Sequence, residues 1–228
     1  MKTVLITGVS RGIGKALAQR FLAEGYMVIG ASETGSVDYS AVNLKVLELD
    51  LTSDNSINKC AEQIAKQNPK IDILVNCAGV LKDNDDTKLV IEKLRETLEV
   101  NVIGTADFTE HVVAMMNKGG HIVNVSSQAG SLEDIEAFTH THAPLRYPAY
   151  KISKCALNMY TRTLALRLKY EDERGIVVSS IHPGWVRTDM GGDEAPTTPE
   201  EAANDIYELA ISHPETGQFW YKGKKYPW

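Results

Sequence analysis

Short runs of apolar residues alternate with longer amphipathic segments along almost the whole chain. The short runs are rich in β-branched residues and apolar on both faces, as strands are when helices cover both sides of a sheet. The runs that we expect to be strands cover residues 3–7, 27–31, 45–49, 71–76, 121–126, 177–182 and 218–221. The amphipathic segments that we expect to be helices cover residues 13–24, 53–66, 88–116, 150–170 and 199–211.

Strand and helix in turn imply right-handed crossovers, and therefore an α/β fold with a doubly wound parallel sheet and helices on both faces. No repeat, low-complexity tract or linker interrupts the pattern, so residues 1–228 are expected to form one domain. Two stretches depart from it, a polar insertion at residues 131–148 and a connector rich in Pro, Gly and Thr at residues 190–199. Both follow a strand at the sheet edge where such folds bind ligands.

Composition and charge narrow the class of protein. The 228-residue chain is 43% hydrophobic and 24% charged, which is ordinary for a globular protein. Its net charge of −6 argues against nucleic acid as a partner. The odd, widely spaced cysteines Cys60, Cys77 and Cys155 fit buried thiols of a reducing compartment. No apolar stretch is long enough for a membrane span or a signal peptide, so we expect no membrane contact and a cytoplasmic protein.

A glycine-rich loop at residues 7–14 joins the first strand to the first helix, with the spacing GxxxGxG. Glycines there let backbone N–H groups approach a pyrophosphate at the positive end of the helix. Val9 and Ala16 stand where a P-loop needs Gly and Ser or Thr, so a P-loop is excluded. The alternative is an ordinary glycine-rich turn, but the strand–loop–helix context favours a nucleotide. The candidate cofactor contacts are Gly8, Ser10, Arg11, Gly12, Ile13 and Gly14.

The residue after the second strand bears on the choice of cofactor. NAD enzymes usually place an Asp or Glu there, to bind the ribose 2′-hydroxyl. Here the strand runs into Ser32, and a hydroxyl together with the fork of Arg11 suits a 2′-phosphate. NADPH/NADP+ is therefore favoured over NADH. Glu33 leaves the alternative open, because a shift of one residue would put a carboxylate at this point and reverse the preference.

Tyr150 and Lys154 form a candidate catalytic pair, because residues i and i+4 share one helix face. A free tyrosine has a pKa of about 10, and a neighbouring cation lowers it toward the range of a general acid–base. Such a pair also occurs by chance on solvated helix faces. Its significance here rests on the motifs around it: Asn76 to Gly79 after the fourth strand, Asn101, Ser126 and Ser127 after the fifth, and Pro183 to Thr188 after the sixth.

The motifs TGxxxGIG, NAG, strand-Ser-Ser, YxxxK and PGxVxT follow in this order from residue 3 to about residue 190, and together they resemble the short-chain dehydrogenase/reductase family. The extended branch of that family is disfavoured because Arg11 occupies a glycine position that it requires. The resemblance implies a Rossmann-type sheet of about seven strands in the order 3-2-1-4-5-6-7. Residues 183–192 and the end of the chain are similar to C-factor and sniffer-like carbonyl reductases.

The resemblance also implies roles for single residues. Ser127 would hydrogen-bond the substrate carbonyl, and Tyr150 would protonate it as hydride arrives from the nicotinamide. Lys154 would bind the nicotinamide ribose and lower the pKa of Tyr150, and Asn101 would hold a water that links Lys154 to solvent. The further implied cofactor contacts are Asp50 and Leu51 at the adenine, Asn76, Ala78 and Gly79 along the cofactor, and Pro183, Gly184, Val186 and Thr188 at the carboxamide end.

We therefore expect an NADPH-dependent carbonyl reductase that acts on a small carbonyl or alcohol substrate. An NAD-dependent alcohol dehydrogenase of the same family and a nucleotide-binding signalling protein without turnover remain alternatives. His140 and His142 have a spacing that can bind zinc, but a solvated loop is favoured because no third ligand is near, and no metal is expected. A homodimer is expected through residues 101–116 and 150–170, and the insertion is expected to set substrate specificity.

Overall fold

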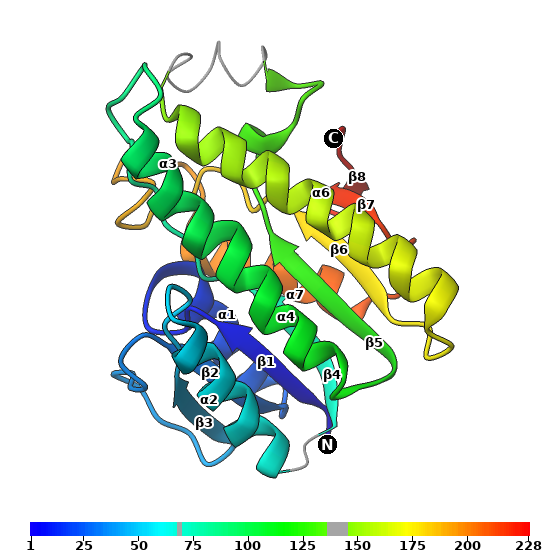
Figure 1. Ribbon diagram of the computed structural model, residues 1–228. Helices are drawn as coiled ribbons and strands as arrows, with labels where there is room; N and C mark the ends of the chain where they lie inside the picture. The colour runs from blue at the N-terminus through cyan, green and yellow to red at the C-terminus, as the bar shows by residue number, and fades with distance from the viewer. Residues whose placement is uncertain (68–69, 136–145) are drawn as a thin grey trace.

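One sheet of eight strands runs through the computed structural model, which describes residues 1–67, 70–135 and 146–228 (Figure 1). The strands are β1 (Thr3–Thr7), β2 (Met27–Ser32), β3 (Leu44–Glu48), β4 (Ile71–Asn76), β5 (Met116–Val125), β6 (Val177–Ile181), β7 (Gln218–Tyr221) and β8 (Lys224–Lys225). Their order is β3-β2-β1-β4-β5-β6-β7-β8, and only the pair β7 and β8 is antiparallel. The predicted order of seven parallel strands is confirmed. β8 was not predicted, because its two residues are too few to leave a periodic pattern in the sequence.

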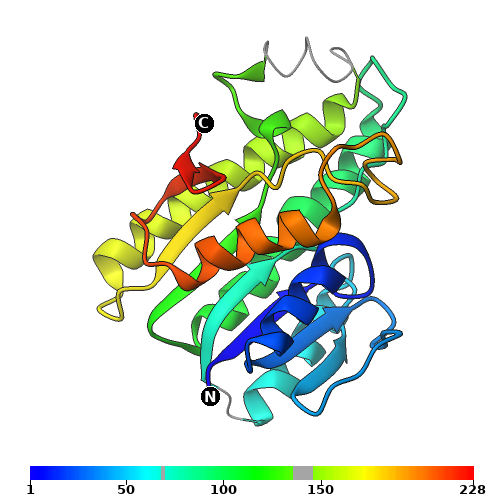
Figure 2. The ribbon, with the colours of Figure 1, turned by 180° about the vertical axis from the view of Figure 1, so that it is seen from behind.

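Helices cover both faces of the sheet, as predicted (Figures 1 and 2). One face carries α2 (Asp54–Lys66), α4 (Thr105–Val113) and α6 (Pro148–Glu171), and the other carries α1 (Gly12–Ala23) and α7 (Pro199–Ile211). The sheet therefore separates two buried apolar clusters. The first includes Ile57, Phe108 and Leu164, and the second includes Leu17, Phe21 and Ile206.

The single helix predicted over residues 88–116 is wrong. The structure has α3 (Ile91–Leu98), a π-helical segment η1 (Glu99–Gly104) and α4, and β5 begins at Met116. The apolar run near Met116 continues from α4 into β5, so hydrophobic periodicity alone does not mark this boundary. Arg174 satisfies carbonyls at the end of the helix, because its guanidinium donates hydrogen bonds of 2.9 and 3.0 Å to the carbonyls of Val113 and Met116.

The π-helical segment brings its helix close to the loop after β3. A Cβ atom on Gly104 would lie only 1.9 Å from the carbonyl oxygen of Leu51, so this approach requires glycine. Extra residues in a π-helical turn change the direction of the side chains that follow, and such turns are frequent at functional sites. Asn101 lies in this segment.

Two regions matter for the site that follows. β2 ends at Ser32, one residue later than predicted, with Ser32 paired to Glu48 of β3. The predicted insertion at residues 131–148 lies largely outside the described residues, as do His140, Thr141 and His142 within it.

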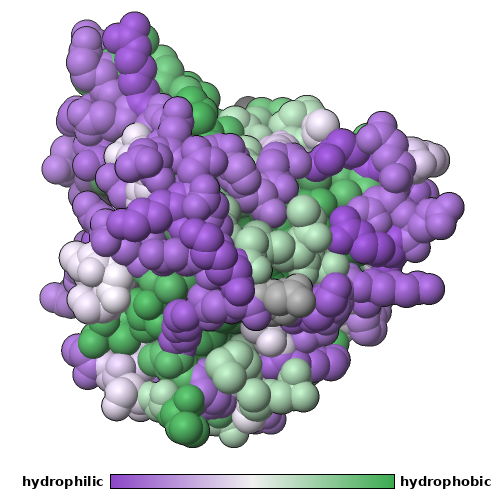
Figure 3. Space-filling view, turned by 60° about the horizontal axis from the view of Figure 1, so that its bottom comes forward, coloured by the Kyte–Doolittle hydropathy of each residue, from purple (hydrophilic) through white to green (hydrophobic). Residues whose placement is uncertain are grey.

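Among the described residues, no helix is long and apolar enough to cross a membrane. Hydrophilic residues cover much of the face seen in Figure 3, and hydrophobic ones gather in smaller areas.

Candidate active site

A cavity of about 1480 Å³ lies at the edge of the sheet where the parallel strands end. Doubly wound sheets bind ligands at this edge. Residues at or just past several strand ends line the cavity, among them Thr7, Ser32, Leu49, Ser127, His182 and Tyr221. Every candidate site residue from the sequence lines it as well, except Asn76 and Asn101.

Asn76, a predicted cofactor contact, does not line the cavity. Its side chain is 2% exposed and donates hydrogen bonds of 2.8 and 2.7 Å to Thr109 and Asn124. The amide therefore ties β4 to α4 and β5 beneath the cavity. The backbone just after it turns instead toward β1, where the Thr7 hydroxyl accepts from the N–H groups of Cys77 and Ala78, each at 3.1 Å.

The glycine-rich loop leaves room for a ligand through the packing of its backbone. Gly8 has a φ of 77°, and a Cβ on it would lie 2.9 Å from the Cα of Ala78. A Cβ on Gly14 would lie 2.1 Å from the carbonyl oxygen of Gly8. Helix α1 begins at Gly12 with no side-chain cap and no acidic residue in its first turn. Its first N–H groups and positive end therefore suit a pyrophosphate, so the residues fit a dinucleotide.

The structure changes the interpretation of the adenosine end. Ser32 is 3% exposed, and its hydroxyl donates at 3.1 Å to the carbonyl of Ser36, so it is engaged by its own loop. Because β2 extends to Ser32, the first residue after the strand is the exposed Glu33, which also lines the cavity. Glu33 suits the 2′-hydroxyl of NADH, whereas Arg11 suits the 2′-phosphate of NADPH. The exposed guanidinium of Arg11 forms an ion pair with Asp189. The predicted direct role of Ser32 is therefore not supported, and Arg11 is the group suited to a 2′-phosphate.

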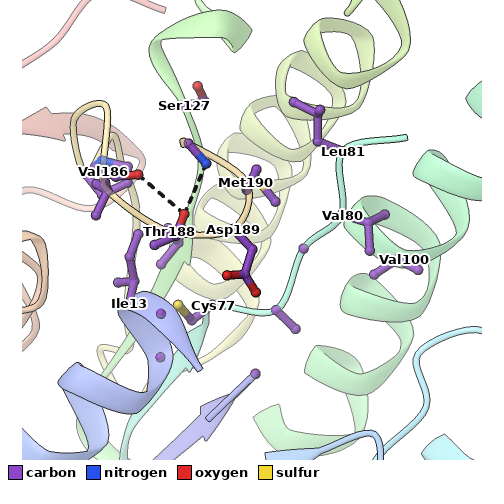
Figure 4. A pocket seen from close by; sticks show the side chains of 18 of the residues that line it. Ile13, Cys77, Val80, Leu81, Val100, Ser127, Val186, Thr188, Asp189 and Met190 are labelled. Carbon is purple, nitrogen blue, oxygen red and sulfur yellow. Dashed lines mark hydrogen bonds between the residues drawn. The ribbon is translucent and has the colours of Figure 1, made fainter. Parts of the chain in front are cut away.

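The segment after β6 folds over the glycine-rich loop. The Thr188 hydroxyl donates to the carbonyl of Val186 at 3.3 Å and accepts from the N–H of Gly191 at 3.2 Å (Figure 4). A Cβ on Gly12 would lie 3.2 Å from the Thr188 methyl group, so the two loops are in contact. In Figure 4, Ile13 and Val186 lie on one side of the pocket and Val80 and Leu81 on the other.

Ser127, Tyr150 and Lys154 line the same cavity as Arg11 and Glu33. Ser127 follows β5, and Tyr150 and Lys154 lie on α6. Burial raises the pKa of Tyr150 to about 12, and a hydrogen bond with Ser127 opposes part of that rise. Burial lowers the pKa of Lys154 to about 8. The expected lowering of the Tyr150 pKa by Lys154 is thus not what the structure shows, since burial dominates.

The Lys154 ammonium is bound by the backbone near Tyr150. It lies 5.5 Å from the centroid of the Tyr150 ring and donates a hydrogen bond of 2.9 Å to the carbonyl of Val125. Lys154 and Asn101 both lie close to Gly79: a Cβ on Gly79 would lie 3.5 Å from the Lys154 Nζ and 3.3 Å from the Asn101 Oδ1. Asn101 exchanges hydrogen bonds with the backbone of Val80, at 2.8 and 2.9 Å. The predicted water held by Asn101 stays a prediction.

Several cavity residues were beyond sequence reasoning. Tyr147 has a left-handed φ of 50° and packs the edge of its ring against Tyr150, with centroids 6.3 Å apart. His182 stacks on Tyr221 at 4.6 Å, and both line the cavity. Pro148 signals that a helix starts after Tyr147. The contacts with Tyr221 come from a strand far along the chain, and no local pattern announces them.

The fold and the cavity define a dinucleotide-dependent oxidoreductase. The fold is a doubly wound parallel sheet, and one cavity combines the glycine-rich loop at the start of α1 with a Ser–Tyr–Lys group. The model of the short chain dehydrogenase family matches residues 2–199, and the chain belongs to this family.

Known proteins of the family resemble the chain over nearly its whole length. Carbonyl reductase (NADPH) 1 of Mus musculus is 28% identical over 271 residues, covering 98% of this chain and 97% of that protein. An NADPH-bound carbonyl reductase from chicken fatty liver has a TM-score of 0.87 at 26% identity, covering 100% of this chain and 94% of that one. The carbonyl reductase Sniffer of D. melanogaster has a TM-score of 0.84 at 26% identity, covering 100% of both chains. The predicted resemblance to sniffer-like reductases is confirmed.

Proposed function

We propose that this protein is a carbonyl reductase that transfers a hydride from NADPH to a small carbonyl substrate. The observation that carries the proposal is one cavity that is lined both by Ser127, Tyr150 and Lys154 and by the uncapped start of α1. The proteins it resembles include an NADPH carbonyl reductase and an NADPH-bound carbonyl reductase structure. The reduced nicotinamide would supply the hydride, and the side chains would supply orientation and the proton.

Tyr150 is the proton donor in this mechanism. Its pKa of about 12 keeps the phenol protonated at neutral pH, as reduction of a carbonyl requires. The Ser127 hydroxyl, already within hydrogen-bonding reach of Tyr150, would hold the same carbonyl oxygen and stabilise the charge that develops on it. Lys154, with a pKa of about 8, is mostly a cation at neutral pH and would bind the ribose hydroxyls. Asn101 would support a water that returns the proton to Tyr150 through Lys154.

The cofactor choice rests on Arg11. An exposed guanidinium at the glycine-rich loop can bind a 2′-phosphate with two hydrogen bonds, once it leaves Asp189. Glu33 favours the second candidate, an NAD-dependent alcohol dehydrogenase, since a carboxylate just after β2 can accept from a 2′-hydroxyl. Titration of the protein with NADPH and NADH separates the two. Tighter binding of NADPH supports the proposal, and a clear preference for NADH overturns it.

A screen of NADPH consumption tests the activity. It would cover quinones, aldehydes, diketones and ketosteroids, with the Tyr150→Phe variant run beside the wild type. Consumption that depends on both the carbonyl compound and Tyr150 supports the proposal. Tight NADPH binding without Tyr150-dependent reduction of any compound would favour the non-catalytic nucleotide-binding protein.

A homodimer through α4 and α6 is part of the proposal. The outer side of α6 exposes Ile152, Met159, Leu166 and Tyr170 by 42%, 66%, 50% and 75%. Apolar side chains spaced along one helix face suit burial against a second copy. Met159→Lys should shift the mass measured by light scattering from dimer to monomer. The cytoplasmic location and the single-domain organisation stay predictions of the sequence.

A further inference from the structure

The helix that carries Tyr150 and Lys154 begins in a strained way. Its N-cap residue, Tyr147, has φ 50° and ψ 56°, a left-handed conformation that bulky side chains rarely adopt. Pro148 follows and restricts the backbone of Tyr147 further. The Tyr147 side chain makes no capping hydrogen bond to the first turn. This start of α6 therefore needs support from elsewhere in the fold.

Asp83 supplies that support from the loop after β4. Its side chain is 0% exposed, and its Oδ2 accepts a hydrogen bond of 2.6 Å from the N–H of Ala149. Ala149 is the second residue of α6, the position whose N–H an N-cap side chain normally accepts. Its Oδ1 has no hydrogen-bond partner among the described residues. Burying a carboxylate is costly, and its hydrogen bond with Ala149 and the nearby charges of Lys151 and Lys93 offset part of that cost.

The rest of the same turn holds the chain just before the helix. The N–H of Asp86 donates to the Asp83 carbonyl at 3.0 Å, which closes the turn. The Asp86 carbonyl then accepts from the N–H of Tyr147 at 2.9 Å. The turn thus forms hydrogen bonds to the backbone on both sides of the Tyr147–Pro148 bond, at Tyr147 and at Ala149. Tyr150 comes immediately after Ala149, so a displacement of the first turn would move the phenol.

We propose that Asp83 is a positioning residue for catalysis: it caps α6 from a distance and so fixes the Tyr150 phenol against Ser127. This inference rests on the proposed reductase function. Asp83 acts through the helix and touches neither substrate nor cofactor. Misplacement of a reacting group by about 1 Å can lower the rate on the order of 100-fold. Removal of the cap should therefore reduce kcat and leave the binding of NADPH intact.

Three variants separate positioning from general stability. Asp83→Ala removes the acceptor, and Asp83→Asn keeps an oxygen that can accept from Ala149. Asp54→Asn makes the same change at the start of α2, on an exposed side chain that does not line the cavity. We expect Asp83→Ala to lower kcat on the order of 10- to 100-fold, with the KM for NADPH within about two-fold of wild type. Asp83→Asn should recover most of the loss, and Asp54→Asn should match the wild type.

Amide hydrogen exchange gives a readout that does not depend on activity. The N–H of Ala149 has no partner within its own helix, so its protection depends on Asp83. Exchange at Ala149 should accelerate in Asp83→Ala and stay close to wild type in Asp83→Asn. If Asp83→Ala does not fold, Asp83→Glu, which moves the acceptor by one methylene, should show the same fall in kcat.

Three results would overturn the proposal. One is unchanged kcat in Asp83→Ala, another is an equal loss of NADPH binding and of kcat, and the third is failure of Asp83→Asn to recover activity. A wild type that reduces no carbonyl compound would instead refute the proposed function, and exchange at Ala149 would still report whether Asp83 caps the helix.

Discussion

Two parts of the cavity lining are built in different ways: the glycine-rich loop (the cofactor end) and the group of Ser127, Tyr150 and Lys154 (the catalytic end). The cofactor end comes mainly from one continuous segment, the glycine-rich loop, whose shape is fixed by backbone atoms in close contact. The catalytic end combines Ser127 after β5 with Tyr150 and Lys154 on α6, and Asp83 after β4 holds the start of that helix. Backbone packing tolerates no added atom, whereas the catalytic end depends on hydrogen bonds, burial and charge. Substitutions should therefore change different properties: NADPH binding at the cofactor end and kcat at the catalytic end.

The largest effect is expected at the catalytic end, from Tyr150→Phe. Loss of the proton donor should lower kcat by about 1,000-fold, within the usual range for general acid catalysis, and leave NADPH binding unchanged. The matched control is Tyr160→Phe on the same helix, where the hydroxyl contacts Ala106 and Glu110. Steady-state kinetics and NADPH titration measure both quantities. A kcat within about ten-fold of the wild-type value would mean that Tyr150 is not the acid.

A Cβ atom at the cofactor end should instead weaken NADPH binding. Gly8 and Gly25 both have a φ of 77°, but a Cβ on Gly8 meets Ala78 at 2.9 Å and one on Gly25 meets nothing within 4 Å. Both alanine variants should lose about 1–2 kcal/mol of unfolding free energy from the left-handed backbone. Only Gly8→Ala should also weaken NADPH binding, by about 10- to 100-fold, since a 1.4 kcal/mol change is ten-fold. Equal NADPH affinity in the two variants would refute the close-packing argument.

Arg11→Ala should weaken NADPH binding about ten-fold and leave NADH binding unchanged, because only the 2′-phosphate is lost as a partner. Lys15→Ala removes the same charge nearby, from a side chain that pairs with Asp38 and does not line the cavity. Asp189→Ala should act in the opposite direction and tighten NADPH binding, because it frees Arg11. A similar loss for both cofactors in Arg11→Ala would show that Arg11 holds the pyrophosphate instead.

The smallest effect concerns pH. Carbonyl reduction needs a protonated Tyr150, and its pKa of about 12 keeps that form present throughout the neutral range. Lys154 has a pKa of about 8, so its charge is present below that pH and is lost above it. The reduction rate should therefore fall about four-fold between pH ~7 and pH ~8.5, as the charged fraction of Lys154 falls. Lys154→Arg stays charged and should show a flat profile at a lower rate; a decline that persists in it would exclude Lys154.

The fold could be predicted where its causes are local. Helix α7 matches its predicted bounds, and its capping box between Thr198 and Glu201 lies within four consecutive residues. The predicted helix over residues 88–116 was wrong because a π-helical segment interrupts it and β5 begins at Met116, where Arg174 from far along the chain donates to the carbonyls of Val113 and Met116. The seven parallel strands were found from buried apolar runs and their ends moved, as at Ser32, whereas the short β8 was missed.

The site divides in the same way. The glycine-rich loop and the Tyr150–Lys154 spacing are local patterns, and the structure places both on one cavity. The pKa of Tyr150 could not be predicted, because burial by distant segments outweighs a charge four residues away. Asp83 was missed since its contact with Ala149 joins residues 66 positions apart. The one-residue extension of β2 could not be predicted either. It makes Glu33 the first residue after the strand, while the Ser32 hydroxyl bonds to its own loop.

Transfer of a labelled hydride tests the central claim most directly. NADPH carrying deuterium at the transferred position would be incubated with the protein and a carbonyl compound that it consumes, and the product analysed by mass spectrometry and NMR. The account predicts an alcohol with deuterium on the former carbonyl carbon, formed by the wild type and not by Tyr150→Phe. NADPH oxidation without label in the alcohol, or equal labelling by Tyr150→Phe, would contradict it.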